Sequence, residues 1–369
     1  MQTEQPVPRA HRARPALLVP SYVFSTLLGG DSESFIVGTE AGRAIAVDRV
    51  GTIYVAGITT LRDFPRTPNA IQDTHLGQSD IFFTKVQSDG KKILYSTFLG
   101  GEGLDTVNAI YIEPSGTNVY LTGSTTSARF PTTPNAYQNF LNGGQPIARD
   151  GFLSKINANG QLVYSTYLGG NGDDQFNGVV GDDAGNAYVI GTTSSTNMPT
   201  TVDAIQANVS GGATGEPYDA FIAYLNGNAN RVTWATYLGG PRNDEGNAIT
   251  RDARGNLFIA GYTQSSGFPL TANALQRTTG FGTNTAFIAR IGDQRSDASQ
   301  LVIVSGDKQQ GEQGTSLKAP LIVELRDQFN VPIANQSVGL PGPPVPCDAR
   351  SGFLLLGSPP WIMKPGMTR

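Results

Sequence analysis

The chain has 369 residues, and its 45 glycines, 23 prolines and low charged fraction of 15% favour short strands and tight turns over helices. A net charge of −4, with the arginines of the N-terminal tail as the one basic cluster, argues against a nucleic-acid surface. The single cysteine, Cys347, excludes an internal disulfide and a multi-cysteine zinc site, and no apolar run approaches the about 18 residues of a membrane-spanning helix.

Residues 1–20 are predicted to form a disordered N-terminal tail. Arginines precede the short apolar run Ala16–Val19, an arrangement that faintly resembles a signal peptide. The run is shorter than the apolar region of about 7–15 residues that a signal peptide has, and prolines flank it. We therefore predict no functional signal peptide in this chain and no membrane insertion.

Residues 21–292 contain four copies of a unit of about 70 residues, marked by a recurring Leu-Gly-Gly. An apolar and aromatic run, typical of a β-strand, precedes each copy, as in Val163-Tyr164-Ser165-Thr166-Tyr167. The Leu-Gly-Gly copies begin at Leu28, Leu99, Leu168 and Leu238.

Each unit also contains two hairpins. The first has an acidic residue and, three positions later, a glycine at its turn: Asp48 with Gly51, Glu113 with Gly116, Asp182 with Gly185 and Asp252 with Gly255. The second begins with the strands that follow Asp80, Asp150, Asp219 and Thr285. Two hairpins make four strands, which is the content of one β-propeller blade. The sequence thus predicts an all-β fold with a β-propeller of four four-stranded blades.

The two ends of this region are predicted to complete one blade. The first copy begins with only its last strand, Tyr22–Leu27, and the final copy stops after its third strand, Ala286–Ile291. Pairing these strands would close the last blade and remove two exposed sheet edges. The alternative is an open fragment of a larger ring.

The repeat resembles the bacterial SBBP-type β-propeller repeat. The resemblance rests on Tyr-Ser-Thr-Tyr-Leu-Gly-Gly, on Gly-Asn-Ala-Tyr-Val-Ile-Gly at 185–191, on Phe-Pro-Thr-Thr-Pro-Asn-Ala-Tyr-Gln at 130–138 and on Asp-Ala-Phe. The family name implies a seven-bladed ring, whereas this chain supplies four units. The resemblance implies an extracellular or cell-surface bacterial protein, of a kind that mostly lacks an assigned activity.

Residues 299–340 differ from the repeats. Their apolar runs Leu301–Val304 and Leu321–Leu325 resemble the first strands of a bacterial Ig-like domain of the invasin or intimin type. A complete sandwich needs about 100 residues, so the resemblance implies a partial domain. Residues 341–369 are predicted to form an irregular tail.

Three aspartates in one column of the repeat, four residues after the second glycine, are the candidate metal ligands. Asp105, Asp174 and Asp244 could form a ring of carboxylates that binds Ca²⁺, with Ser34 in the same column of the first copy. Recurrence in nearly every blade favours the alternative that each aspartate caps a loop. The same structural interpretation is preferred for Asp80, Asp150 and Asp219.

Other side chains are predicted to be structural or incidental. We expect His75 to be an incidental surface residue. The Phe-Pro or Met-Pro pairs of the four units are expected to cover blade edges, and the alternative is an aromatic ligand-binding rim. These pairs begin at Phe64, Phe130, Met198 and Phe268.

The sequence favours a noncatalytic extracellular or cell-surface platform whose propeller loops bind a protein or glycan partner, with no cofactor beyond possible Ca²⁺. No catalytic residue is assigned. One alternative is a hydrolase or lyase with its site in the central pocket, for which Arg242, Glu245 and Tyr262 depart from the other repeats. A second is a truncated gene product without an independent role. A Gly-x-Ser-x-Gly nucleophile elbow and a phosphate-binding loop are both absent from the sequence.

Overall fold

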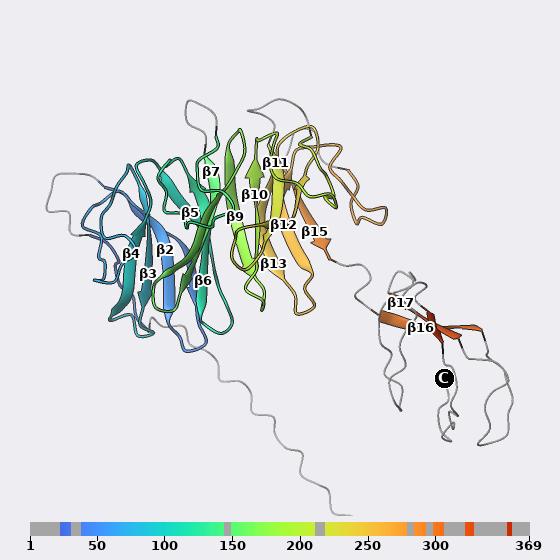
Figure 1. Cartoon of the computed structure of the whole chain (residues 1–369), viewed down its shortest axis with the longest axis horizontal. Helices are drawn as coiled ribbons and strands as arrows, with labels where there is room; N and C mark the ends of the chain where they lie inside the picture. The colour runs from blue at the N-terminus through green and yellow to red at the C-terminus, as the bar shows by residue number, and fades with distance from the viewer. Residues whose placement is uncertain are drawn as a thin grey trace, which may run out of the picture. The chain divides into compact units, whose positions relative to one another are not determined.

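The computed structural model describes residues 23–30, 38–143, 149–210, 218–278, 284–292, 298–305, 322–327 and 353–355. All regular secondary structure within these ranges is β-strand (Figure 1). No helix in the described ranges is long and apolar enough to cross a membrane. The chain divides into two compact units, residues 1–176 with 228–231 and residues 177–227 with 232–369. The all-β prediction is confirmed for the described residues.

Two four-stranded antiparallel sheets lie in the first unit, each with its strands in chain order. The first sheet consists of β1 (Glu40–Val47), β2 (Ile53–Thr59), β3 (Asp80–Val86) and β4 (Ile93–Leu99). The second sheet consists of β5 (Asp105–Ile112), β6 (Asn118–Thr125), β7 (Asp150–Asn157) and β8 (Leu162–Leu168). Each sheet corresponds to two hairpins of the repeat, as predicted.

The third and fourth sheets follow the same plan. The third sheet consists of β9 (Asp174–Gly181), β10 (Ala187–Thr193), β11 (Asp219–Leu225) and β12 (Val232–Leu238). The fourth has three strands, β13 (Asp244–Arg251), β14 (Leu257–Thr263) and β15 (Thr285–Ile291). The prediction of four strands is therefore correct for three sheets and not for the fourth.

The predicted N-terminal strand is not formed. Tyr22 lies outside the described residues, and Val23–Leu28 has no strand conformation. A segment becomes a strand only when a neighbouring strand satisfies its backbone groups. Closure of the fourth sheet by these residues stays a prediction.

Successive sheets within a unit pack face to face. Alternate side chains of the first sheet, Tyr54, Ala56, Ile81 and Phe83, form one apolar cluster with side chains of the second. We call this face of each sheet its trailing face and the opposite face its leading face. The second sheet contributes its leading face to the cluster through Val107, Val119, Leu121, Phe152 and Ile156. The fourth sheet packs on the third in the same way, with Ile259 and Phe287 against Ile190, Ala220 and Ile222.

The long loop that joins the second and third strands of each repeat covers the edge of the fourth strand. In the first sheet, Thr67 N donates to Ser96 O at 3.0 Å and Phe98 N donates to Gln72 O at 3.1 Å. The same two bonds recur at Thr133 and Gln138 in the second sheet and at Thr201 and Gln206 in the third. The loop thus satisfies edge groups that would otherwise be a template for aggregation.

A β-bulge in the first hairpin of the repeat explains why glycine stands opposite it. The register shifts between Val107 and Ala109, and a Cβ atom at Gly123 would collide with the carbonyl oxygen of Thr106. Because that obstacle is backbone, Gly123→Ala is expected to lower the free energy of unfolding by about 1–3 kcal/mol. Chemical denaturation measures the change. Gly42→Ala is the control, since a Cβ atom at Gly42 meets only Val55 Cγ1 at 3.7 Å; equal losses for both variants would contradict the prediction.

The C-terminal region contains a three-stranded antiparallel sheet of β16 (Ala298–Ser305), β17 (Ile322–Asp327) and β18 (Phe353–Leu355). The first two strands overlap the apolar runs predicted from the sequence, and β18 lies in the tail predicted to be irregular. The remaining residues of the predicted Ig-like segment lie outside the described residues. An Ig-like domain here stays a prediction.

Candidate functional site

The predicted metal ligands Asp105, Asp174 and Asp244 are buried at the first positions of β5, β9 and β13. Each carboxylate accepts a hydrogen bond from the backbone N–H of the second glycine of Leu-Gly-Gly, at 2.8 Å from Gly101 and at 2.7 Å from Gly170 and from Gly240. The hydroxyl groups of Ser127 and Ser265 donate to Asp105 and Asp244 at 2.9 and 2.8 Å. The aspartates therefore fix the chain where it passes from one repeat to the next.

Glu40 takes this role in the first sheet. Its carboxylate accepts a hydrogen bond from Gly30 N at 3.0 Å, and Glu40 opens β1 as Asp105 opens β5. Ser34, the residue predicted for this column, lies outside the described residues. Glu40 lies eight positions before the turn residue Asp48, the same spacing as Asp105 to Glu113, so counting from the hairpin rather than from the glycines finds it.

A second row of buried aspartates, Asp80, Asp150 and Asp219, opens β3, β7 and β11. Each is joined to the first glycine of Leu-Gly-Gly through a glutamine that the sequence analysis did not single out. In the first sheet, Gln72 Nε2 donates to Asp80 at 2.9 Å and Gln72 Oε1 accepts from Gly100 N at 3.0 Å. Gln138 and Gln206 repeat this bridge in the second and third sheets. These glutamines could have been found from the sequence, since Gln138 is the last residue of the motif Pro-Asn-Ala-Tyr-Gln and the other repeats have a glutamine at the same position.

The two rows bring carboxyl groups together in pairs. The carboxylates of Asp80 and Asp105 both lie beside Gly100, and those of Asp219 and Asp244 both lie beside Gly239. Burial raises the pKa of Asp105 to about 6, and the nearby charge of Asp80 adds to the rise. Burial likewise raises the pKa of Asp219 to about 7, with a contribution from Asp244. Such pairs hold protons more tightly than isolated carboxyl groups do.

The arrangement provides few free oxygen atoms for a cation. Within the described ranges, no three His, Cys, Asp or Glu side chains come together in a group that could hold a metal ion. The Oδ1 atoms of Asp150, Asp219 and Asp244 are buried without a hydrogen-bond partner, while the other oxygen of each carboxylate accepts hydrogen bonds from the loops. The Ca²⁺ site of Asp105, Asp174 and Asp244 stays a prediction.

His75 is buried, which contradicts the prediction of an exposed residue. Its Nε2 lies 3.1 Å from the carbonyl oxygen of Thr59, and its ring packs edge-on against Phe98 at 5.8 Å. The loop that carries His75 folds back over the first sheet because Asp80 accepts hydrogen bonds from Leu76 N and Gly77 N. A loop position alone was therefore a poor guide to exposure.

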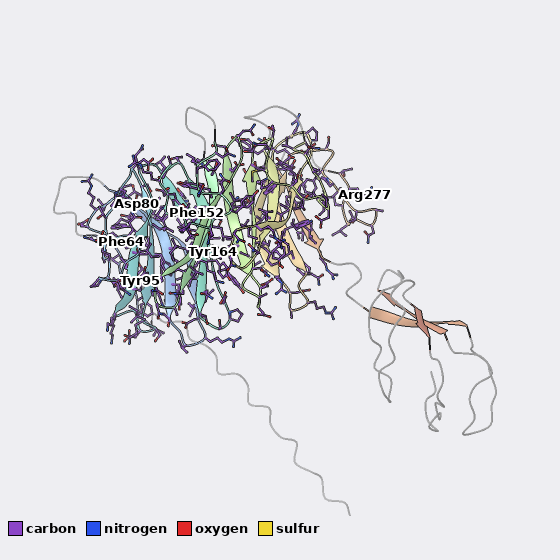
Figure 2. The ribbon with its side chains drawn as sticks, viewed as in Figure 1. Phe64, Asp80, Tyr95, Phe152, Tyr164 and Arg277 are labelled. Carbon is purple, nitrogen blue, oxygen red and sulfur yellow. The ribbon has the colours of Figure 1, made fainter. Side chains whose placement is uncertain are left out.

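The large apolar residues before the loop prolines are buried against the sheets and do not form an exposed ligand-binding rim. Phe64 stacks on Phe82 at 4.3 Å, and Phe130 contacts Phe152 at 4.7 Å. Figure 2 shows Phe64 and Asp80 toward one end of the first sheet, with Tyr95 toward the other. Burial of Phe64, Phe130, Met198 and Phe268 supports the structural interpretation of this column.

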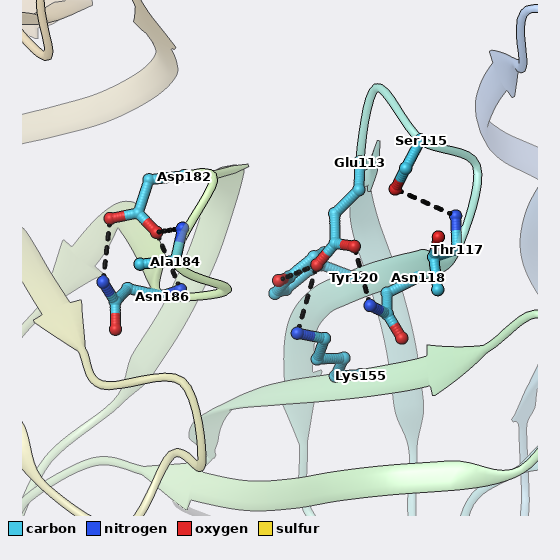
Figure 3. A network of polar contacts seen from close by, with 9 residues as sticks. All are labelled: Glu113, Ser115, Thr117, Asn118, Tyr120, Lys155, Asp182, Ala184 and Asn186. Carbon is cyan, nitrogen blue, oxygen red and sulfur yellow. Dashed lines mark hydrogen bonds and ion pairs between the residues drawn. The ribbon is translucent and has the colours of Figure 1, made fainter.

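The acidic turn residues differ between repeats (Figure 3). Asp182 closes its own turn, since Oδ1 accepts from Ala184 N at 3.0 Å and from Asn186 N at 2.9 Å. Glu113 is one methylene longer and does not do so. Its carboxylate instead accepts from Tyr120 Oη and from Asn118 Nδ2, both at 2.6 Å, and pairs with Lys155 Nζ at 3.1 Å. This buried ion pair is a departure specific to the second sheet.

Two of the three residues flagged for an enzyme alternative meet in the fourth sheet. Tyr262 Oη donates to Glu245 at 2.7 Å, across the β13–β14 pairing. Burial, followed by this hydrogen bond to Glu245, raises the pKa of Tyr262 to about 12. Arg242 lies in the preceding loop, where its backbone N–H donates to Ser265 Oγ.

Comparison with known proteins identifies the repeat. Residues 163–198 and 233–269 match the SBBP family model, described as a β-propeller repeat. Among solved structures, a protein of unknown function from Dyadobacter fermentans is similar at 14% identity, with a TM-score of 0.34 over 78% of this chain and 72% of that one. A protein of unknown function from Bacteroides caccae is similar at 13% identity, with a TM-score of 0.25 over 61% of this chain and 72% of that one. Comparison with curated proteins gave no match. Each matched segment runs from a fourth strand through the next hairpin, so these two segments are similar to the SBBP β-propeller repeat.

Proposed function

We propose that the chain is a noncatalytic binding or scaffolding platform, located outside the cell or at its surface, whose long loops engage a protein or glycan partner. The support is the contrast between the two kinds of side chain on these loops. The buried carboxylates hold the loops' own backbone, whereas large apolar side chains of the same loops face solvent. The location rests on the resemblance to exported and surface-associated repeat proteins.

Phe140 is the residue best placed to contact a partner. It is 59% exposed, and its carbonyl oxygen accepts a hydrogen bond from Gln138 Nε2 at 3.0 Å. The equivalent glutamines of the other sheets donate to Thr74, Asn208 and Thr278, so an aromatic ring at this position is specific to the second sheet. A fixed backbone presents the ring with little entropy to lose on binding, and exposed aromatic rings are frequent binding hot spots.

A glycan array and a pull-down from cell envelopes test the proposal with the full chain. We expect a retained ligand whose affinity falls at least tenfold, or about 1.4 kcal/mol, in Phe140→Thr, which carries the residue of the first and fourth repeats. Val163→Thr, an exposed change on β8, is the control and is expected to bind normally. No retained ligand in either assay, or equal binding by both variants, would contradict the proposal.

The hydrolase or lyase alternative is favoured by the Glu245 and Tyr262 pair, which the other three sheets do not repeat. A carboxylate that orients a tyrosine hydroxyl is a combination found in acid–base catalysis. Turnover of a polysaccharide or peptide substrate that is lost in Tyr262→Phe would replace the platform proposal with this one.

A further inference from the structure

An amine, an amide and a carboxylate meet at one end of the second sheet. Glu113 Oε1 lies 3.1 Å from Lys155 Nζ, and Glu113 Oε2 accepts a hydrogen bond from Asn118 Nδ2 at 2.6 Å. Figure 3 shows the Glu113 carboxylate between these two nitrogen atoms. The strand register permits this approach, since Lys155 of β7 pairs with Tyr120 of β6, and Asn118 lies two residues before Tyr120 on the same face. Asn118 and Lys155 therefore both contact one carboxylate.

The three groups lie largely away from water. The side chain of Lys155 is 7% exposed and that of Glu113 is 14% exposed. The buried rings of Tyr120 and Tyr164 lie 4.8 and 6.0 Å from Lys155 Nζ. Burial disfavours separated charges, so the transfer of a proton from the Lys155 ammonium to Glu113, which gives a neutral amine and a neutral acid, costs less here than in water. A neutral amine is the form that attacks an amide carbon.

The second repeat alone combines these residue types. Here the position that pairs with Tyr120 is a lysine, and the residue whose carbonyl oxygen accepts from the backbone N–H of the turn acid is an asparagine. In the first, third and fourth sheets these two positions hold Lys85 and Thr52, Tyr224 and Asn186, and Arg290 and Asn256. The first sheet thus lacks the amide, and the other two lack the lysine. A set of side chains that served the structure of the repeat would recur, so its restriction to one repeat favours a reaction.

We propose that Lys155 and Asn118 form an amide bond within the chain, with Glu113 as the proton-transfer group. Glu113 takes one proton from the Lys155 ammonium, and the neutral Nζ attacks Asn118 Cγ. Glu113 then gives its proton to Nδ2 and takes a second proton from Nζ, so that the Nζ–Cγ bond is completed as the Cγ–Nδ2 bond breaks. The remaining proton leaves with the ammonia as ammonium, and Glu113 is again a carboxylate.

The contacts around Glu113 match these steps. Its two oxygen atoms face the attacking nitrogen and the leaving nitrogen, so one group serves both proton transfers without moving through solvent. The reaction changes no oxidation state and needs no cofactor. Chains that have not reacted keep the buried ion pair of Glu113 and Lys155.

The bond would close the segment that contains Phe140. This segment joins β6 to β7 and lies between Asn118 and Lys155 in the sequence. Exposed loops are frequent sites of proteolytic cleavage. With the bond in place, a cut between the two strands leaves both of them covalently joined, so the second sheet keeps its strands after cleavage.

Mass spectrometry of the full chain tests the proposal. We expect the wild-type chain to be lighter than the sum of its residues by about 17 Da, the mass of one ammonia molecule. Lys155→Arg keeps the positive charge without the amine, and Asn118→Thr carries the residue of the first repeat, so neither should show the loss. Asn186→Thr removes the equivalent asparagine of the third sheet and should keep it. An unshifted wild-type mass, or a loss that persists in Lys155→Arg, would overturn the proposal.

Trypsin cleavage locates the bond. Arg129 and Arg149 lie between the two joined residues in the sequence. After cleavage there, the two wild-type fragments should migrate as one band on a reducing denaturing gel, whereas those of Lys155→Arg should separate. Glu113→Gln keeps the size of the side chain but cannot carry the proton, and it is expected to slow bond formation about a hundredfold. Separate wild-type fragments would overturn the bond, and an equal rate in Glu113→Gln would overturn the role of Glu113.

Discussion

Replacing Asp219 with asparagine is expected to change the free energy of unfolding little at pH 4 and to raise it by about 3–4 kcal/mol at pH 8. Asp219 is fully buried, and its Oδ1 faces the same glycine as Asp244 without a hydrogen-bond partner. Asparagine keeps an oxygen for the hydrogen bonds from Gln206 and Ser210 N and places an amide beside Asp244. The variant therefore removes a buried like-charge repulsion while the loop bonds remain.

The sign follows from the raised pKa of Asp219. The folded protein holds this proton up to about pH 7, whereas the unfolded chain releases it near the ordinary value of 3.8. A group that binds its proton more tightly when folded stabilises the fold at low pH, and that contribution is lost as the pH rises through about 7. Wild-type stability should therefore decline from pH 5 to pH 8, and the decline should be smaller in Asp219→Asn.

Urea denaturation at each pH measures the effect. Asp183→Asn removes an exposed carboxylate in the β9–β10 turn, at the other end of the sheet from Asp219, and should leave the dependence of stability on pH unchanged. A lower stability of Asp219→Asn than of wild type at pH 8 would show that the fold needs the negative charge there. If added Ca²⁺ then stabilised the wild type more than Asp219→Asn, the result would support the alternative that these carboxylates bind a cation.

The repeat was predictable because it recurs in register. Hydrophobic alternation and the acidic turns determine the strands of each sheet, and Gly116 and Gly185 have the positive φ angles that their place in those turns predicted. The first strand of each sheet could also be predicted from the sequence, since Asp105 and its equivalents stand at a fixed number of residues before the acidic turn.

The parts that the sequence analysis missed depend on contacts between distant residues. Glu40 was missed because ten residues separate it from Gly30, whereas four separate Asp105 from Gly101. His75 is buried because the loop folds back onto the sheet, which no local pattern encodes. Residues 23–28 have no strand conformation, and their pairing with Ala286–Ile291 stays a prediction because it depends on contacts between the two ends of the repeat region.

Replacing Glu113 with alanine is expected to lower the free energy of unfolding by about 3–5 kcal/mol. The Lys155 side chain is only 7% exposed, and Glu113 is its carboxylate partner at 3.1 Å. The rings of Tyr120 and Tyr164 lie 4.8 and 6.0 Å from Lys155 Nζ, which attracts the cation but does not replace a negative charge. The variant removes the carboxylate that accepts from Tyr120 Oη and pairs with Lys155 Nζ, and it leaves the ammonium charge buried.

The pair also gives a pH dependence opposite to that of Asp219. Burial alone would raise the pKa of Glu113, but hydrogen bonds from Tyr120, Asn118 and Lys155 outweigh it and lower the pKa below 4.5. The contribution of Glu113 is therefore present above pH 4.5 and is lost as the pH falls through its folded pKa. Acid and alkaline losses of stability should then respond to different variants, Glu113→Ala and Asp219→Asn.

A double-mutant cycle separates the pair from packing. Glu113→Gln with Lys155→Met replaces both charges by side chains of similar volume, and it is expected to recover most of the loss because no charge remains buried. Arg149→Ala, which removes the more exposed ion pair with Asp173, should cost only about 1 kcal/mol or less. Denaturation at neutral pH measures the free energy of unfolding of the four chains of the cycle, which are wild type, Glu113→Gln, Lys155→Met and the double variant. A double variant as unstable as Glu113→Ala would mean that the carboxylate acts through its hydrogen bonds with Asn118 and Tyr120 rather than through the lysine.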